Sequence, residues 1–340
     1  MEGIFYCKDV HLIGLLQEYI PVSHALSEEQ VAAPLRNAYD MFLRPLLGDT
    51  QADSLSNAVK AWVDDDVQPL DDIQHAIDLS RQATVNLAFW YSFTELNTHI
   101  TDQGFQRSEG ETYKPIYRYQ ELELKQQLRN KGFNAVDKLL RFMYERSPSF
   151  PLFLQGEAWT DLAHALVRGP KEIDKYFYVH GSYLVYLKLR PAFCRIMELF
   201  IEPTLGKSVS KVLSDYLENY TSPTYIPPAD TTAAILEKLR EKVVPVVVCK
   251  ALSEHVRNVG EITDRGLYYT TIQASATENQ ATLMGSDSER ARQAANLYSM
   301  ALHYKHKLIG WVEDYLPHYF KGHPEDAFNR DNDHKHTFWA

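Results

Sequence analysis

The stretch THITDQGFQRSE (98–109) has a near-copy later in the chain, GEITDRGLYYTT (260–271). Both contain Ile-Thr-Asp-x-Gly followed by a large apolar residue. Their aspartates, Asp102 and Asp264, lie 162 positions apart (264 − 102 = 162). A catalytic motif needs to occur only once in a chain, so the doubling indicates an architecture of two related halves.

Both motifs have the composition of a turn. The carboxylates of Asp102 and Asp264 can fold back onto nearby backbone N–H groups, while Gly104 and Gly266 can supply a positive φ. No partner base or metal ligand repeats beside either aspartate. We therefore interpret these four residues as structural rather than catalytic.

Two further pairs of segments repeat in the same order along the chain: MFLRPLLGD (41–49) with LFIEPTLGK (199–207), and KLLRFMYE (138–145) with KLIGWVED (307–314). The first pair is separated by 158 positions (206 − 48 = 158) and the second by 169 (307 − 138 = 169). Gly48 and Gly206 follow predicted helix ends, where glycine can take a left-handed conformation. Three landmarks in one order predict an internal duplication, with the differences in spacing absorbed in loops.

Apolar residues recur at helical spacing on both sides of each Ile-Thr-Asp-x-Gly motif. The sequence predicts a helix from Asp71 toward His99, and its counterpart begins near Asp230, which we expect to be the N-cap. A last long helix is expected to reach Tyr319. The predicted fold is therefore all-α: two tandem, internally duplicated helical bundles with short extended or β-hairpin segments and a C-terminal arm. The expected boundaries are 1–146 for the first bundle, 147–320 for the second and 321–340 for the arm, with SPSFP (147–151) as the junction.

The composition narrows the functional classes. The 340 residues carry a formal net charge of −10, and lysine and arginine are scattered among acids, which disfavours tight binding of DNA or RNA. Three widely spaced cysteines, Cys7, Cys194 and Cys249, exclude a zinc ribbon and a disulfide framework and fit a reducing cytoplasm. The sequence shows no signal peptide and no apolar run long enough to span a membrane. Aromatic residues reach 12%, which suits large contact areas as well as cores.

The chemistry of an enzyme has weak support. His303 and His306 are one turn apart on the last predicted helix and could share a metal ion, but no Glu-x-x-His or His-Glu-x-x-His pattern accompanies them. No phosphate-binding loop, Gly-x-Gly-x-x-Gly or Gly-x-Ser-x-Gly occurs. We expect no enzyme activity, no cofactor and no metal, with a metal-dependent helical enzyme using His303, His306 and nearby acids as the alternative.

The residues that frame the motifs also carry a resemblance. FLRPLLGD, a long helix, ITDQGFQRSE and then YRYQELELKQQL followed by GFNAVDKLLRFM look like an uncharacterised two-repeat family found in tailed phages and prophages of gut bacteria. Each half also resembles, more distantly, the small helical head–tail adaptor proteins of tailed phages. AYDMFLRPLLG and RIMELFIEPTLG stand where those proteins have a helix end before a long helix, although the intervening residues depart from the adaptor pattern.

The resemblance implies a structural virion protein assembled in the host cytoplasm. Such proteins form rings, commonly twelvefold, below the portal protein and continue the DNA channel toward the tail. The expected partners are therefore other copies of the chain, the portal, neighbouring tail proteins and passing genomic DNA that is not bound by sequence. A scaffold for other tail proteins, without a ring of its own, stays open. The candidate interface residues lie in the segments after the two turns and in the arm: Phe105, Arg107, Tyr113, Tyr117, Tyr268, Tyr269, Phe338 and Trp339.

Overall fold

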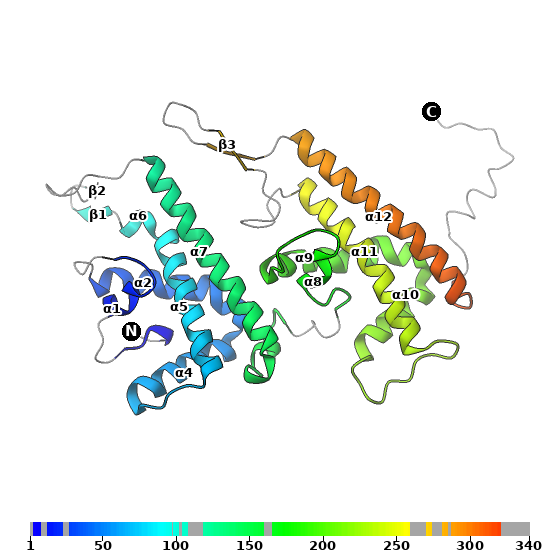
Figure 1. Cartoon of the computed structure of the whole chain (residues 1–340), viewed down its shortest axis with the longest axis horizontal. Coiled ribbons are helices and arrows are strands. Elements are labelled where there is room, and N and C mark those ends of the chain that lie inside the picture. Colours follow the sequence, from blue (N-terminus) through cyan, green and yellow to red (C-terminus); the bar gives the residue numbers. More distant parts are fainter. Residues whose placement is uncertain are drawn as a thin grey trace. The chain divides into compact units, whose positions relative to one another are not determined.

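The fold is all-α and consists of two compact units, as seen in the computed structural model of the chain (Figure 1). The first unit comprises residues 1–160 with 272–282, and the second comprises 161–271 with 283–340. The residues whose structure is described are 3–7, 12–22, 27–96, 98–101, 104–107, 118–159, 165–258, 270–273, 281–284 and 287–320. The expected arm, 321–340, lies outside them. Besides the helices, the described residues include two short β-sheets of two strands each.

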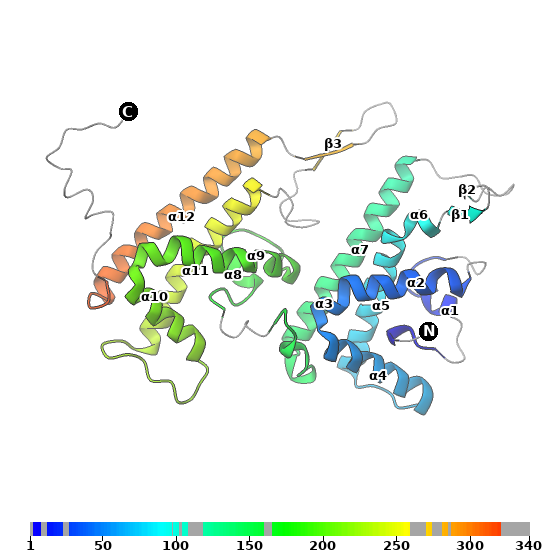
Figure 2. The same ribbon diagram turned by 180° about the vertical axis from the view of Figure 1, so that it is seen from behind.

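The first unit is built around two long helices, α5 and α7, that run side by side in both views (Figures 1 and 2). Helix α2 packs across α5, and α4 packs against the N-terminal turn η1. The elements are η1 (Gly3–Phe5), α1 (Leu12–Gln17), α2 (Glu28–Ala38), η2 (Tyr39–Leu43), α3 (Arg44–Leu47), α4 (Asp49–Asp65), α5 (Asp71–Tyr91), α6 (Phe93–Leu96), β1 (Thr98–Thr101), β2 (Gly104–Arg107), α7 (Arg118–Glu145), η3 (Ser147–Ser149) and η4 (Phe153–Gln155).

The second unit repeats this plan with α11 and α12 as its central pair. Helices α9 and α10 pack against α11. In the order of elements along the chain, α9 corresponds to α2 of the first unit and α10 corresponds to α4. Its elements are α8 (Pro170–Asp174), α9 (Tyr183–Ile196), η5 (Met197–Ile201), α10 (Glu202–Asn219), α11 (Ala233–Asn258) and α12 (Asp287–Tyr315). The strand pair β3 (Thr270–Gln273) and β4 (Ala281–Met284) lies between α11 and α12 in the sequence, and its residues within 272–282 are grouped with the first unit.

The buried residues of the two units occur at equivalent sequence positions, separated by nearly constant spacings. From α2 to α4 the spacing stays at 158: Val31, Leu35 and Ala38 correspond to Leu189, Phe193 and Ile196, and all six are buried. Along α5 and α11 the spacing is 159, and along α7 and α12 it is 169. At that last spacing Leu128, Leu139 and Met143 correspond to Leu297, Leu308 and Val312, again all buried. Two units with the same buried positions are two copies of one bundle design.

Three boundaries differ from the sequence-based expectation. Helix α5 ends at Tyr91 rather than near His99, because Phe93–Leu96 forms a separate turn of helix before strand β1. Helix α11 begins after Thr232, whose hydroxyl accepts a hydrogen bond from the Ile235 N–H, so Thr232 and not Asp230 supplies the cap.

The segment 147–159 also departs from expectation, because it belongs to the first unit rather than to the second. The Trp159 indole N–H donates to the Leu46 carbonyl at 2.6 Å, and its ring is buried against Phe153. The Ser149 hydroxyl donates to the Asp72 carboxylate at the start of α5. These long-range contacts anchor the segment to the first bundle.

Glycines 48 and 206 occupy the same position in the two units but have different surroundings. Their φ angles are 79° and 78°, and their ψ angles of 149° and 159° lie outside the left-handed helical region, in a region that almost only glycine adopts. A Cβ on Gly48 would lie 3.1 Å from the Cα of Gly156, whereas a Cβ on Gly206 would meet nothing within 4 Å. Gly48 is therefore constrained by both its backbone and its neighbour.

The seam between the central helices is closely packed at Gly132. A Cβ there would lie 2.6 Å from the Leu87 Cγ and 3.2 Å from the Leu87 backbone nitrogen. The corresponding positions in the second unit are Ala301 and Val246, and both are fully buried. The pair of glycine and leucine in the first unit has the same number of side-chain carbons as the pair of alanine and valine in the second. The total side-chain volume at this point of the seam is therefore conserved, although one carbon has moved from one helix to the other.

We predict that Gly48→Ala destabilises the chain more than its matched control, Gly206→Ala. Both changes force alanine into a glycine-only backbone region, at a cost of about 1–3 kcal/mol. Gly48→Ala adds the displacement of Gly156, for about 1–3 kcal/mol more. Urea unfolding of the full chain measures the difference. Equal losses for the two variants would contradict the close approach of Gly48 and Gly156.

We predict that Gly132→Ala lowers the free energy of unfolding by about 1–2 kcal/mol, because overpacking outweighs the better helix propensity of alanine. Adding Leu87→Val to this variant recreates the volume of the second seam and restores most of the loss. Leu87→Val alone destabilises, since it leaves a gap. The four chains form a double-mutant cycle in urea unfolding. If the double variant lost the sum of the stabilities lost by the two single variants, the two seams would not be equivalent.

Candidate functional site: two equivalent surfaces and a buried arginine network

Most of the residues that the sequence singles out as structural turns or interface candidates fall outside the described part of the chain. These are Asp102, Asp264, Gly266, Tyr113, Tyr117, Tyr268, Tyr269, Phe338 and Trp339. Strand β2 contains Gly104, Phe105 and Arg107, and it pairs antiparallel with β1 so that Thr101 lies opposite Gly104 and Thr98 opposite Arg107. The expectation of an extended segment after the first motif therefore has a backbone counterpart in this hairpin.

Each unit contains a π-helix at the same place, which nothing in the sequence signals. Residues 39–43 and 197–201 form these turns, again 158 positions apart (197 − 39 = 158). The Arg44 N–H bonds the Tyr39 carbonyl, and the Glu202 N–H bonds the Met197 carbonyl, which is the i→i+5 pattern. Such turns are rare and occur frequently at functional sites. Their presence in both copies directs attention to the surfaces they form.

In the first unit the π-helix η2 contributes to a partly exposed cluster of rings, here called the aromatic surface. Phe42 lies 5.9 Å, centroid to centroid, from each of three rings: Trp90 and Tyr91 on α5, and Phe133 on α7. The Arg129 guanidinium lies over Trp90 at 5.7 Å and over Phe133 at 5.8 Å. Beside this cluster, Met41 and Tyr91 remain 49% and 54% exposed. The aromatic surface is thus apolar, with one cation at its edge.

In the second unit the π-helix η5 contributes to a different surface, here called the lysine surface. Phe200 occupies the position of Phe42, but lysines cover it: Lys250 at 5.5 Å and Lys305 at 5.1 Å from Nζ to the ring centroid. Lys250 also lies 4.5 Å from the Tyr298 ring. Leu199, in the position of Met41, is 70% exposed.

The two surfaces have exchanged cation and ring at equivalent positions. On the central helix, Tyr91 of the first unit corresponds to Lys250 of the second (250 − 91 = 159). On the neighbouring helix, Arg129 corresponds to Tyr298 (298 − 129 = 169). In each unit a cation lies over an aromatic ring beside the central phenylalanine, but the helices contribute opposite partners: Arg129 of α7 lies over Trp90 of α5, whereas Lys250 of α11 lies over Tyr298 of α12. Duplication has produced two related surfaces of different chemistry.

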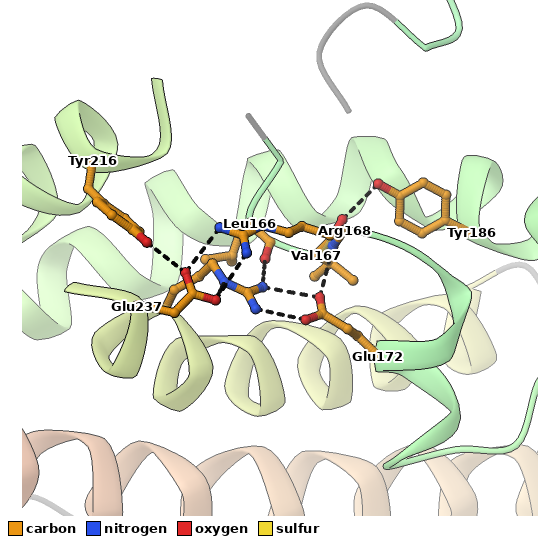
Figure 3. Close-up of polar contacts among 8 residues, drawn as sticks. Leu166, Val167, Arg168, Glu172, Tyr186, Tyr216 and Glu237 are labelled. Carbon is orange, nitrogen blue, oxygen red and sulfur yellow. Dashed lines mark hydrogen bonds and ion pairs between the residues drawn. The ribbon is translucent and has the colours of Figure 1, made fainter. Parts of the chain in front are cut away.

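The second unit also contains a buried ion-pair network around Arg240 on α11 (Figure 3). The Arg240 side chain is 5% exposed and pairs with Glu172 at 2.8 Å and with Glu237 at 3.0 Å, while it donates to the Leu166 carbonyl at 2.6 Å. Arg168 forms a bidentate pair with Glu237, at 3.0 Å for both bonds. The network joins the segment 165–168 to α8 and α11.

Hydrogen bonds and charge favour the ionised form of Glu237. Partial burial acts to raise the pKa of Glu237, but the hydrogen bond from the Tyr216 hydroxyl and the charges of Arg240 and Arg168 outweigh it and lower that pKa. Burial acts to lower the pKa of Arg240, yet its bonds to Glu172 and its attraction to both carboxylates raise it. The arrangement is suited to holding a loop in place, because every charge faces an opposite one.

The first unit has a counterpart of this arginine. Arg81 on α5 corresponds to Arg240 (240 − 81 = 159), is 7% exposed, and donates from Nε to the Ile4 carbonyl at 2.8 Å. In both units a buried arginine of the central helix therefore holds the carbonyl of the segment that precedes the bundle. Sequence reasoning missed both residues, because each arginine has polar or charged neighbours in the sequence and its burial is set only by the fold.

The candidate metal ligands of the last helix do not converge. His303 and His306 are both exposed, and His306 Nδ1 bonds the Leu302 carbonyl of its own helix at 2.9 Å, while the His303 ring lies against Tyr304. Within the described ranges, no three His, Cys, Asp or Glu side chains are grouped so as to hold a metal ion. Helices long and apolar enough to cross a membrane are likewise absent from the part of the chain that the structure describes.

Comparison with known proteins gives one match, and it follows the duplication. Residues 43–161 and 201–328 each match the model of one family, described as a family of unknown function (DUF6712). The first match includes the segment 147–159 that anchors to the first unit. No curated protein and no solved structure matches the chain.

We predict that Glu237→Gln lowers the free energy of unfolding at pH 7 by about 1–3 kcal/mol, because two arginines lose a charged partner. The control Glu254→Gln has similar side-chain exposure (28% against 30%) and also loses two partners, Arg195 and Lys250, but both are more exposed than Arg240 (54% and 20% against 5%), so it loses less than about 1 kcal/mol.

The lowered pKa of Glu237 also fixes the direction of the pH effect. The stabilisation that ionised Glu237 gives to the folded state is complete above the ordinary glutamate pKa, and it is lost as the pH falls through the lowered pKa of the folded state. The stability difference between wild type and Glu237→Gln therefore shrinks from about pH 5 downward. Chemical denaturation at a series of pH values measures it. A difference that grows on acidification would contradict the assignment.

Proposed function

The chain belongs to this family, DUF6712, and we propose that it is a structural virion protein: a subunit of a ring at the head–tail interface of a tailed phage, below the portal, that continues the DNA channel to the tail. The resemblance of its two halves to phage head–tail adaptors supports the role. The internal duplication, found in both the family match and the burial pattern, supports a building block with two bundles.

The observation that carries the proposal is the pair of diverged π-helix surfaces. A closed ring is assembled head to tail, so each subunit needs two different surfaces that fit one another. A duplicated bundle with unchanged surfaces would offer the same patch twice. Here the exposed Tyr91 and the half-buried Arg129 of one unit stand where Lys250 and Tyr298 stand in the other. Exposed methionine, tyrosine and arginine are also typical of the centres of protein interfaces.

The charge of the chain is compatible with a DNA channel. The net charge of −10 per subunit is multiplied in a ring, and a lumen lined with acids repels phosphates, so DNA can pass without adhering. The portal, tail proteins and other copies of the chain are the proposed partners. Genomic DNA passes through the lumen and is not bound by sequence.

The test is to locate the protein in purified virions. Antibody labelling of an epitope-tagged chain, read by electron microscopy, is expected to mark the neck between head and tail, and mass spectrometry of purified particles is expected to give a fixed copy number per virion. Label confined to the head or the tail tip, or the absence of the chain from particles, would contradict the proposal. A scaffold without its own ring predicts a sub-stoichiometric or variable copy number.

A further inference from the structure

The aromatic and lysine surfaces both leave large, mainly apolar side chains exposed to solvent. Met41 and Tyr91 on the first, and Leu199 and Tyr298 on the second, are between 38% and 70% exposed. Large side chains grouped beside a rare turn, in both copies of a duplicated unit, mark interaction surfaces. The chemistry of the two surfaces indicates what covers them.

We infer that the aromatic surface of one copy of the chain packs against the lysine surface of the next copy. This inference rests on the proposed ring and names the contact that would build it. When the two surfaces face each other with equivalent positions opposed, Tyr91 meets Lys250 of the neighbour and Arg129 meets its Tyr298. Both pairs then join a cation to an aromatic ring. The two central phenylalanines, Phe42 and Phe200, meet in the middle.

Pairing of identical surfaces is disfavoured by the same chemistry. Two lysine surfaces would bring the Lys305 ammonium groups of the two copies together, and like charges at close range repel, whereas the charge of Lys250 is offset in part by Glu254 at 3.3 Å. Two aromatic surfaces would place the Arg129 side chains of both copies in one contact. In the pairing of unlike surfaces, Arg129 and Lys250 each face a ring at the equivalent position of the neighbouring copy, instead of a second copy of the same cation. Such a head-to-tail contact continues from copy to copy until the rotation closes a ring.

Two double variants test the contact without disturbing the core. Met41→Lys with Tyr91→Lys alters the aromatic surface, and Leu199→Lys with Tyr298→Lys alters the lysine surface. All four side chains are more than a third exposed, and Tyr91→Lys reproduces the residue that the second unit has at that position. Each double variant opposes a new lysine to an existing cation, Lys250 or Arg129, on the neighbour. Leu70→Lys and Ile226→Lys, at 74% and 85% exposed apolar positions outside both surfaces, are the matched controls.

The mass of each full-length chain in solution is measured by sedimentation over a range of concentrations, with circular dichroism melting to establish folding. Wild type and controls are expected to assemble into rings, while each double variant sediments as a monomer of 39.2 kDa, with self-association weakened at least about a hundredfold. An equimolar mixture of the two double variants is the decisive sample. Each retains one intact surface, so the mixture gives a one-to-one dimer and nothing larger.

Each outcome bears on one proposal. Double variants that assemble as the wild type does, or a mixture that stays monomeric, would overturn the pairing of these surfaces while the ring itself stands. A wild type that is monomeric at every concentration also overturns the pairing, and the virion labelling then decides separately whether a ring forms below the portal. A wild-type dimer that each double variant abolishes, with no dimer in the mixture, would show that another partner or a symmetric contact covers the surfaces.

Discussion

The close packing of two long helices along one seam is the constraint on which each unit depends. In the first unit Gly132 lets α7 approach the backbone of α5, and in the second Ala301 and Val246 occupy the equivalent positions with the same total of side-chain carbon. Because the interior is close-packed, side-chain volume can move from one helix of such a seam to the other, but the total volume has to stay the same. The remaining helices of each bundle then pack against the seam at the same buried positions.

A fixed seam leaves the outer faces of the same helices free to diverge. The buried arginines, Arg81 and Arg240, illustrate both tendencies. Each holds the carbonyl of the preceding segment, so the role is retained, and Arg240 in addition pairs with Glu172 and Glu237. On the outside, the residues around Phe42 and Phe200 have exchanged rings for cations. The duplicated chain thus combines two similar cores with two unlike surfaces, which is what head-to-tail assembly requires.

The sequence predicted the fold class and the duplication because both rest on patterns that a sequence contains. Helical periodicity and repeated landmarks such as the segments ending at Gly48 and Gly206 need no tertiary information. The end of α5 at Tyr91, the cap at Thr232 and the attachment of 147–159 through Trp159 were not predicted, because each is decided by competition between local signals or by a distant partner. Propensity alone does not resolve such competition.

The two surfaces around Phe42 and Phe200 were not predicted, for a related reason. The sequence directed attention to the segments after the two Ile-Thr-Asp-x-Gly motifs, where aromatic residues are adjacent in the chain. The two surfaces described here are assembled from three elements each, and residues such as Phe42, Trp90 and Phe133 come together only in the fold. A π-helix adds no residue-type signal, since the turns 39–43 and 197–201 contain ordinary helix-forming residues.

The central claim is that one bundle design, used twice, joins copies of the chain through unlike surfaces. The most direct measurement is an electron cryomicroscopy map of the assembled particle at a resolution that shows side chains. The account predicts that the first unit of every subunit contacts the second unit of its neighbour, with Phe42 and Phe200 on the two sides of that contact. A map in which first units contact first units, or in which both phenylalanines face solvent, would contradict it.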